Sequence, residues 1–149
     1  MAKVSRLHHI GIPVSDMERS IAFYTRLLGF TEAGITATAQ GPELSAVLQV
    51  DDAELEAVFL RSGDLFLELL HYSSPEIKPF SGRNCDVGVV HVCFEVDSVQ
   101  AVHDELVAEG VAFNAPPMTL EEGDLAGHTF AYFRDPDGIQ LELFELPKA

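Results

Sequence analysis

The feature that most constrains this chain is a supersecondary unit that occurs twice. Residues 89–110 begin with alternating apolar and polar positions, which predicts a strand that carries His91 on one face, and continue into an amphipathic helix that ends at a glycine. Residues 7–29 follow the same order, with His9 in the strand. The two histidines are 82 positions apart (91 − 9). Self-similarity of this kind predicts two copies of one structural module.

Each predicted helix has a plausible start signal. In the first copy, Ser15 and Glu18 form the pattern of a capping box. In the second copy, Asp97 is the expected N-cap, with Gln100 three residues further on. The order of elements therefore agrees between the two copies at this level as well.

Further strands follow each helix, so we expect a β-α-β-β-β order in both modules and an α+β fold class. A Pro- and Gly-containing linker at 73–86 separates them. We expect one domain, 1–149, made of two modules at about 5–73 and 87–147. The segment 31–49 is expected to form a strand followed by a mobile loop. The remaining expected strands are 57–61 and 65–72 in the first module, and 111–114, 128–134 and 139–145 in the second.

Composition excludes several classes of partner. The net charge of −15 argues against nucleic acid, which needs a basic surface, and mildly against a highly anionic substrate. No apolar run is long enough to span a membrane, and the start of the chain has no signal-peptide pattern. The only two cysteines are Cys85 and Cys93, which favours a reducing compartment and no disulfide framework. We expect a cytoplasmic protein.

In each module, one glutamate lies between leucines in the last strand. A carboxylate in this setting is rarely buried unless it is paired or holds a metal ion. Glu68 and Glu142, together with His9 and His91, would supply four N and O ligands for a divalent ion such as Zn, Ni, Co or Mn. The alternative is that the glutamates face solvent on an open sheet and the histidines only form hydrogen bonds.

Four segments carry the pattern of strands and helices described above: HHIGIPVSDMERSIAFYTRLLGF, LFLELL, VVHVCFEVDSV and YFRDPDGIQLELFE. They resemble the marker segments of the vicinal oxygen chelate superfamily, which includes glyoxalase I, methylmalonyl-CoA epimerase, extradiol dioxygenases, fosfomycin-resistance proteins and bleomycin-binding proteins. The resemblance covers nearly the whole chain. It implies paired βαβββ modules that form a cupped, mostly antiparallel sheet around one divalent metal ion, with ligands at His9, Glu68, His91 and Glu142.

Among the members of this superfamily, glyoxalase I and the epimerases use the four positions found here. Extradiol dioxygenases and fosfomycin-resistance proteins use three protein ligands, and bleomycin-binding proteins use none. The segments ELLHY and VHVCFEVDSV are most similar to the sequence of methylmalonyl-CoA epimerase. The resemblance implies a metal-dependent epimerase, isomerase or lyase that abstracts a proton next to a metal-bound carbonyl. The alternatives are a glyoxalase I-like lyase, a non-catalytic small-molecule or antibiotic-binding protein, and an extradiol dioxygenase.

In this interpretation Glu142 is the best candidate for the general base and Glu68 for the partner acid. The substrate is a small carbonyl compound, and the family resemblance together with open sheet edges indicates a homodimer. Other residues have less certain roles. His128 is a candidate for substrate contact. Glu56 is either a second acid/base group or, more in keeping with its acidic neighbours, part of a solvated face.

Overall fold

The computed structural model describes residues 3–148 and consists of two units, one up to Lys78 and the other from Pro79 onward. Each unit has one four-stranded sheet and the strand and helix order of a βαβββ module. The predicted α+β class is therefore confirmed. In each sheet one pair of strands is parallel and the others are antiparallel, so both sheets are mostly antiparallel, as expected.

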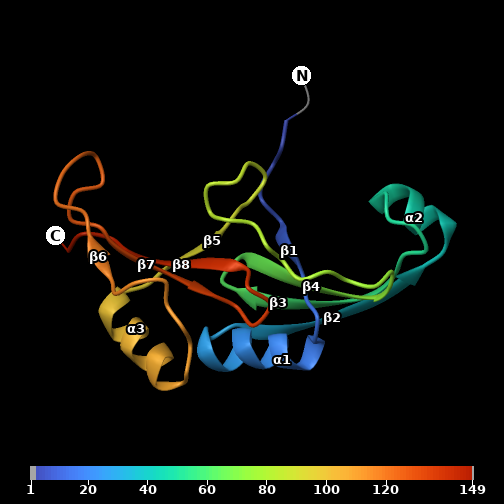
Figure 1. Cartoon of the computed structure of the whole chain (residues 1–149), viewed down its shortest axis with the longest axis horizontal. Helices are drawn as coiled ribbons and strands as arrows, with labels where there is room; N and C mark the ends of the chain where they lie inside the picture. The colour runs from blue at the N-terminus through green and yellow to red at the C-terminus, as the bar shows by residue number, and fades with distance from the viewer. Residues whose placement is uncertain (1–2, 149) are drawn as a thin grey trace. The chain divides into compact units, whose positions relative to one another are not determined.

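The first unit has the strand order β1-β4-β3-β2, with β1 and β4 parallel (Figure 1). From β1 the chain passes through α1 to β2 at the far edge of the sheet and returns through β3 to β4 beside β1. Its elements are β1 (His9–Pro13), α1 (Met17–Ala22), a π-helical turn η1 (Phe23–Leu27), β2 (Thr31–Gln40), α2 (Pro42–Leu48), β3 (Glu54–Ser62) and β4 (Leu65–Ser74).

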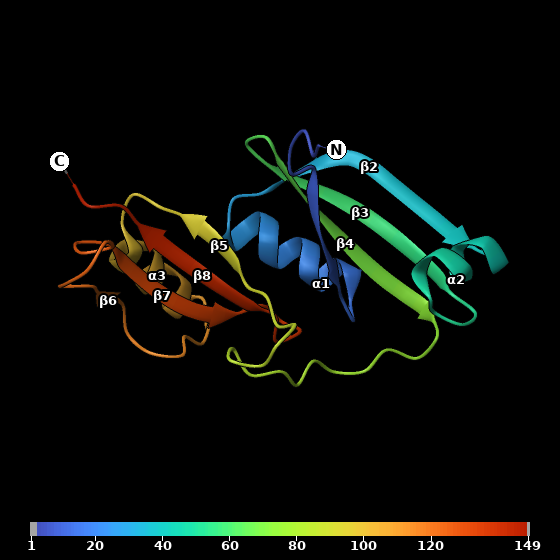
Figure 2. The same cartoon turned by 90° about the horizontal axis from the view of Figure 1, so that it is seen from above.

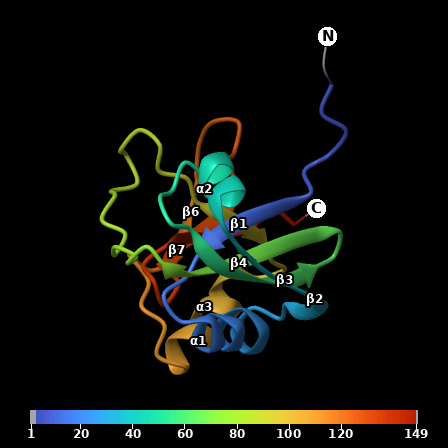
Figure 3. The same cartoon turned by 90° about the vertical axis from the view of Figure 1, so that its right-hand side faces the viewer.

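Side chains of β4 point alternately to the two faces of this sheet. Leu67 and Leu69 are fully buried on the face against which α1 packs. Because successive side chains in a strand point to opposite faces, Glu68 lies on the other face. Helices α1 and α2 lie on opposite sides of the sheet (Figures 1 and 3). Burial of Leu67 and Leu69 on one face therefore places Glu68 on the other face.

The second unit has the strand order β5-β8-β7-β6, with β5 and β8 parallel (Figure 2). Leu141 and Leu143 of β8 are buried together with Leu106 of α3, whereas Glu142 points to the opposite face. Its elements are β5 (Val92–Glu95), α3 (Val99–Ala108), β6 (Met118–Thr119), β7 (Thr129–Arg134) and β8 (Gln140–Glu145).

The expectation of a loop after β2 was wrong, because α2 forms there. Gly41 has a φ of 109°, which reverses the chain direction, and Pro42 occupies the first turn of the helix, where its missing N–H costs nothing. The breakers Gly41 and Pro42 thus mark the start of a short helix. A proline inside a suspected loop predicts a helix start as readily as a turn.

The helix caps lie one residue later than the sequence pattern indicated. Asp16, not Ser15, accepts a hydrogen bond from the Arg19 backbone N–H at 2.9 Å. Ser98, not Asp97, accepts one from the Ala101 backbone N–H at 3.2 Å. In both pairs of neighbours each residue is a good cap former, so the sequence alone did not distinguish them.

Three predicted strands differ in extent. The first strands of the modules begin later than expected, so that His9 is the first residue of β1 and His91 directly precedes β5. In the segment 111–114 only Phe113 forms a bridge, to Phe133, and the second strand of that module is the short β6 instead.

Within residues 3–148, no helix has the length and apolar character needed to cross a membrane.

Candidate functional site

In the first unit, the structure brings His9 and Glu68 together. Gly11 of β1 is the register partner of Glu68 in β4, and His9 lies two residues before it on the same face. The His9 Nε2 and Glu68 Oε2 atoms are 3.2 Å apart. The His9 ring also makes an edge contact with Phe59, at a centroid distance of 5.8 Å. The imidazole is 41% exposed and the carboxylate 19%, so the pair opens to solvent through the histidine.

His8 contacts His9 of this pair and the neighbouring Phe66. Its Nδ1 lies 2.9 Å from the Nδ1 of His9, and its ring stacks on Phe66 at 5.5 Å. One of these two nitrogens donates and the other accepts, so the contact orients the His9 ring and leaves its Nε2 directed at Glu68.

In the second unit, the structure brings His91 and Glu142 together in the same way. The His91 Nε2 and Glu142 Oε2 atoms are 2.9 Å apart, with side-chain exposures of 44% and 10%. The His91 ring makes an edge contact with Tyr132 at 5.3 Å. This contact is the counterpart of the one between His9 and Phe59, as the internal repeat requires.

Two further groups surround Glu142. Cys93 on β5 and Tyr132 on β7 are its register partners on the two neighbouring strands. Partial burial, the negative charge of Glu142 and a hydrogen bond to its carboxylate raise the pKa of Cys93 to about 12. The same causes, in the same order, raise the pKa of Tyr132 to about 12. Both groups therefore stay protonated at neutral pH beside the carboxylate.

Sequence reasoning missed Tyr132 and gave Cys93 no role at the site. Cys93 is exposed on the same face of the sheet as Glu142. Tyr132 lies opposite Glu142 in the β7–β8 hairpin, whose turn is held by Asp135 through hydrogen bonds from the backbone N–H groups of Asp137 and Ile139. The register around that turn was the signal that would have found Tyr132.

Each His–Glu pair fits the geometry of two ligands on one divalent ion. An imidazole nitrogen and a carboxylate oxygen, each bound at about 2.0 to 2.2 Å, lie about 2.9 Å apart at a right angle and about 3.4 Å apart at a tetrahedral angle. The observed separations of 3.2 and 2.9 Å fall in this range. A His–Glu hydrogen bond has the same spacing, so each pair is a plausible half of a metal site.

The predicted four-residue set is present as two separate pairs, His9 with Glu68 and His91 with Glu142. Over residues 3–148, no group of three or more His, Cys, Asp or Glu side chains that could hold a metal ion is found. A joint site of all four residues therefore stays a prediction.

The other histidines belong to local structure. His128 donates a hydrogen bond from Nδ1 to the Leu125 carbonyl oxygen, at 2.9 Å, and its ring contacts that of Phe144. Because Phe144 lies two residues beyond Glu142 in β8, His128 is near the same face of the sheet. His103 contacts the Asp104 carboxylate and the ring of Phe113.

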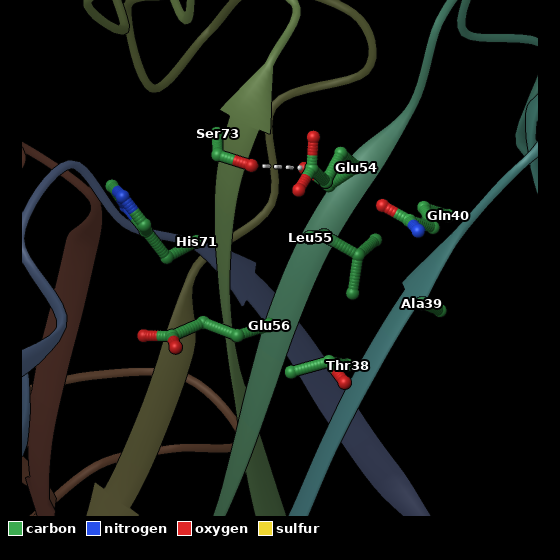
Figure 4. A pocket seen from close by; sticks show the side chains of 8 residues that line it. All are labelled: Thr38, Ala39, Gln40, Glu54, Leu55, Glu56, His71 and Ser73. Atoms are coloured by element: carbon green, nitrogen blue, oxygen red, sulfur yellow. Dashed lines mark hydrogen bonds between the residues drawn. The ribbon is translucent and has the colours of Figure 1, made fainter.

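Glu56 belongs to a different surface of the first unit. It is exposed and pairs with His71, which lies three residues beyond Glu68 and therefore on the opposite face of β4. The His71 Nδ1 is 3.2 Å from the Val14 carbonyl oxygen. A hollow of about 600 Å³ opens here, and Figure 4 shows the side chains of Glu56 and His71 on the same side of their strands. Its polar lining comprises Thr38, Gln40, Glu54, Glu56, His71 and Ser73. Glu56 is therefore an exposed side chain on the face of the sheet that carries Leu67 and Leu69, and it does not adjoin Glu68.

Comparisons with known proteins agree with this arrangement. The chain is 34% identical over 145 residues to a 2-epi-5-epi-valiolone epimerase from an Actinomyces species, covering 95% of this chain and 79% of that protein. It is 28% identical over 147 residues to the mitochondrial methylmalonyl-CoA epimerase of Homo sapiens, covering 94% and 73%. A crystal structure of a glyoxalase family protein from Bacillus cereus has the same fold, with a TM-score of 0.80, 18% identity and coverage of 99% and 97%. The model of the glyoxalase/bleomycin resistance protein/dioxygenase superfamily matches residues 6–143, and the chain belongs to this superfamily.

Proposed function

We propose that this protein is a divalent-metal-dependent epimerase that moves a proton on a carbon next to a carbonyl group. The observation that carries the proposal is the occurrence of two His–Glu pairs at equivalent positions of two repeated modules, with Nε2–Oε2 separations of 3.2 and 2.9 Å. The relatives named as epimerases support the reaction type.

In the proposal, His9, Glu68, His91 and Glu142 hold one ion jointly. A single pair offers two ligands, whereas protein sites for ions of this kind use three or four. Two imidazoles and two carboxylates without a thiolate suit Zn, Ni, Co or Mn. The two pairs come from one chain or from two chains of a dimer. An ion with six positions would leave two for the substrate.

The chemistry divides between the ion and the protein. When bound, the ion polarises the substrate carbonyl and makes the neighbouring C–H bond more acidic. Glu142 accepts the proton, a step for which a positioned base typically contributes about 10²- to 10⁴-fold. Glu68 returns a proton to the opposite face of the carbon, which inverts its configuration. Return of the proton to the adjacent carbon instead would give an isomerisation of the glyoxalase type.

The charge of the chain bears on the substrate class. The sequence has 9 Lys and Arg residues against 24 Asp and Glu residues. This balance favours a neutral or weakly charged carbonyl compound over a polyanionic one. A cyclic hydroxyketone therefore fits the charge better than a coenzyme A thioester, although both classes contain the required acidic C–H bond.

The test uses the metal-loaded protein in D₂O with three substrate classes: α-hydroxyketones, 2-methyl-3-oxo thioesters and hemithioacetals. We expect protein-dependent entry of deuterium at the α-carbon of at least one class, measured by ¹H NMR or mass spectrometry. Tight binding of a compound without any exchange would instead indicate a binding protein. Oxygen consumption with a catechol would indicate a dioxygenase and overturn the proposal.

We also propose that the protein is a homodimer. Each sheet has open edges in the described part of the chain, such as β2 in the first unit and β5 in the second, and an open edge is readily covered by a partner. Light scattering is expected to give twice the chain mass of 16.3 kDa at micromolar concentration. A mass of one chain throughout that range would contradict the dimer.

A further inference from the structure

The internal repeat allows the two half-sites to be compared position by position. Phe59 faces Glu68 across β3 and β4, and Tyr132 faces Glu142 across β7 and β8. On the other side, Gly11 is the register partner of Glu68, and Cys93 is the register partner of Glu142. Each glutamate therefore lies between one aromatic residue and one residue of the parallel first strand.

The geometry of the two half-sites is nearly the same. The ring of His9 meets that of Phe59 at 76° and the ring of His91 meets that of Tyr132 at 80°, both in edge contacts. The His–Glu separations differ by only 0.3 Å (3.2 − 2.9). A difference in behaviour between the two carboxylates must therefore come from the chemistry of the neighbours.

At both neighbouring positions, the second unit has a polar side-chain group that the first unit lacks. Tyr132 has a hydroxyl where Phe59 has none, and Cys93 has a thiol where Gly11 has no side chain. Both the hydroxyl and the thiol therefore lie beside Glu142 on the same face of the sheet. Glu142 has two side-chain hydrogen-bond donors next to it in addition to its partner His91, whereas the counterparts next to Glu68, Phe59 and Gly11, carry no side-chain donor.

We infer that Tyr132 and Cys93 are positioning residues that hold the Glu142 carboxylate in one orientation, while Glu68, whose neighbours Gly11 and Phe59 carry no side-chain donor, is free to adjust. The assignment of the two carboxylates to base and acid rests on the proposed function. A base must lie within hydrogen-bond reach of the proton that it removes, so a fixed Glu142 suits proton abstraction. A movable Glu68 suits delivery of a proton to substrates of different shape.

The first experiment measures metal affinity. Hydrogen-bond partners of ligating groups typically contribute 10- to 100-fold to metal affinity. The double variant Tyr132→Phe/Cys93→Ala is expected to bind Co²⁺ about 10- to 100-fold more weakly than the wild type, in competition with a chromophoric chelator. The matched control is Phe59→Tyr, which adds a hydroxyl at the equivalent position of the other module and is expected to bind Co²⁺ at least as tightly as the wild type. Equal affinity of the double variant and the wild type would overturn the inference.

The second experiment does not depend on metal or activity. Crystal structures of the metal-free wild type and double variant are expected to show one Glu142 rotamer in the former and several in the latter. Glu68 is expected to become better ordered in Phe59→Tyr. An equally ordered Glu142 in both proteins would overturn the inference. A wild type that binds no Co²⁺, with Glu142 nevertheless disordered only in the double variant, would refute the proposed function and leave the positioning role intact.

Discussion

Replacing Glu142 by glutamine is expected to lower the rate of α-deuterium entry by about 10²- to 10⁴-fold, the usual contribution of a positioned general base. Glutamine has nearly the same shape and retains a carbonyl oxygen that can still bind an ion, but its neutral amide does not accept a proton at neutral pH. The rate is measured by ¹H NMR in D₂O on protein whose metal content has been determined. The loss is then expressed per bound ion.

Two further variants make this result specific. Glu56→Gln removes an exposed carboxylate on the opposite face of the first sheet and is expected to leave the exchange rate unchanged. Glu68→Gln is expected to retain exchange at the α-carbon but to lose inversion, because Glu142 still removes the proton and returns it to the same face. Exchange at the wild-type rate in fully metal-loaded Glu142→Gln would contradict the role of Glu142 as the base.

Replacing His91 by alanine is expected to weaken metal binding by more than about 100-fold. Loss of a hydrogen-bond partner of a ligand already costs 10- to 100-fold, and here a ligand itself is removed. The affinity for Co²⁺ or Zn²⁺ is measured by competition with a chelator, and elemental analysis gives the number of ions per chain. One ion per chain is expected in the wild type.

The matched control is His128→Ala, a histidine of the same unit whose ring contacts Phe144 and the Leu125 carbonyl. It is expected to retain wild-type affinity, and any loss of exchange activity in that variant would point to substrate contact. Wild-type affinity in His91→Ala would remove His91 from the ligand set. A wild type that takes up none of Zn, Ni, Co and Mn would refute the metal site as a whole.

The repeated pattern in the sequence was sufficient to predict the two modules and their element order. The alternation of leucines with Glu68 and Glu142 placed each carboxylate on the face opposite the buried leucines, because successive side chains in a strand point to opposite faces. The pairing of each glutamate with the histidine of its own module followed from the same alternation and from the parallel pairing of the first and last strands.

The remaining features depended on competition between similar local signals. Ser15 and Asp16 are both good caps, as are Asp97 and Ser98, and only the backbone geometry selected the second of each pair. Helix α2 formed where breakers suggested a loop, because Gly41 and Pro42 occupy the two positions at a helix start where they are tolerated.

The sequence by itself thus determined the fold class, the repeat and the equivalent positions of His9, Glu68, His91 and Glu142 in the two modules, since all three follow from periodicity within a module. Only the tertiary structure decided what surrounds each carboxylate. Tyr132 and Cys93 come to Glu142 from two different strands, and the registers of the hairpin and of the parallel pair place them there. A shift of one residue in either register would turn these side chains to the opposite face, and such registers are set by packing across strands that are distant in the sequence.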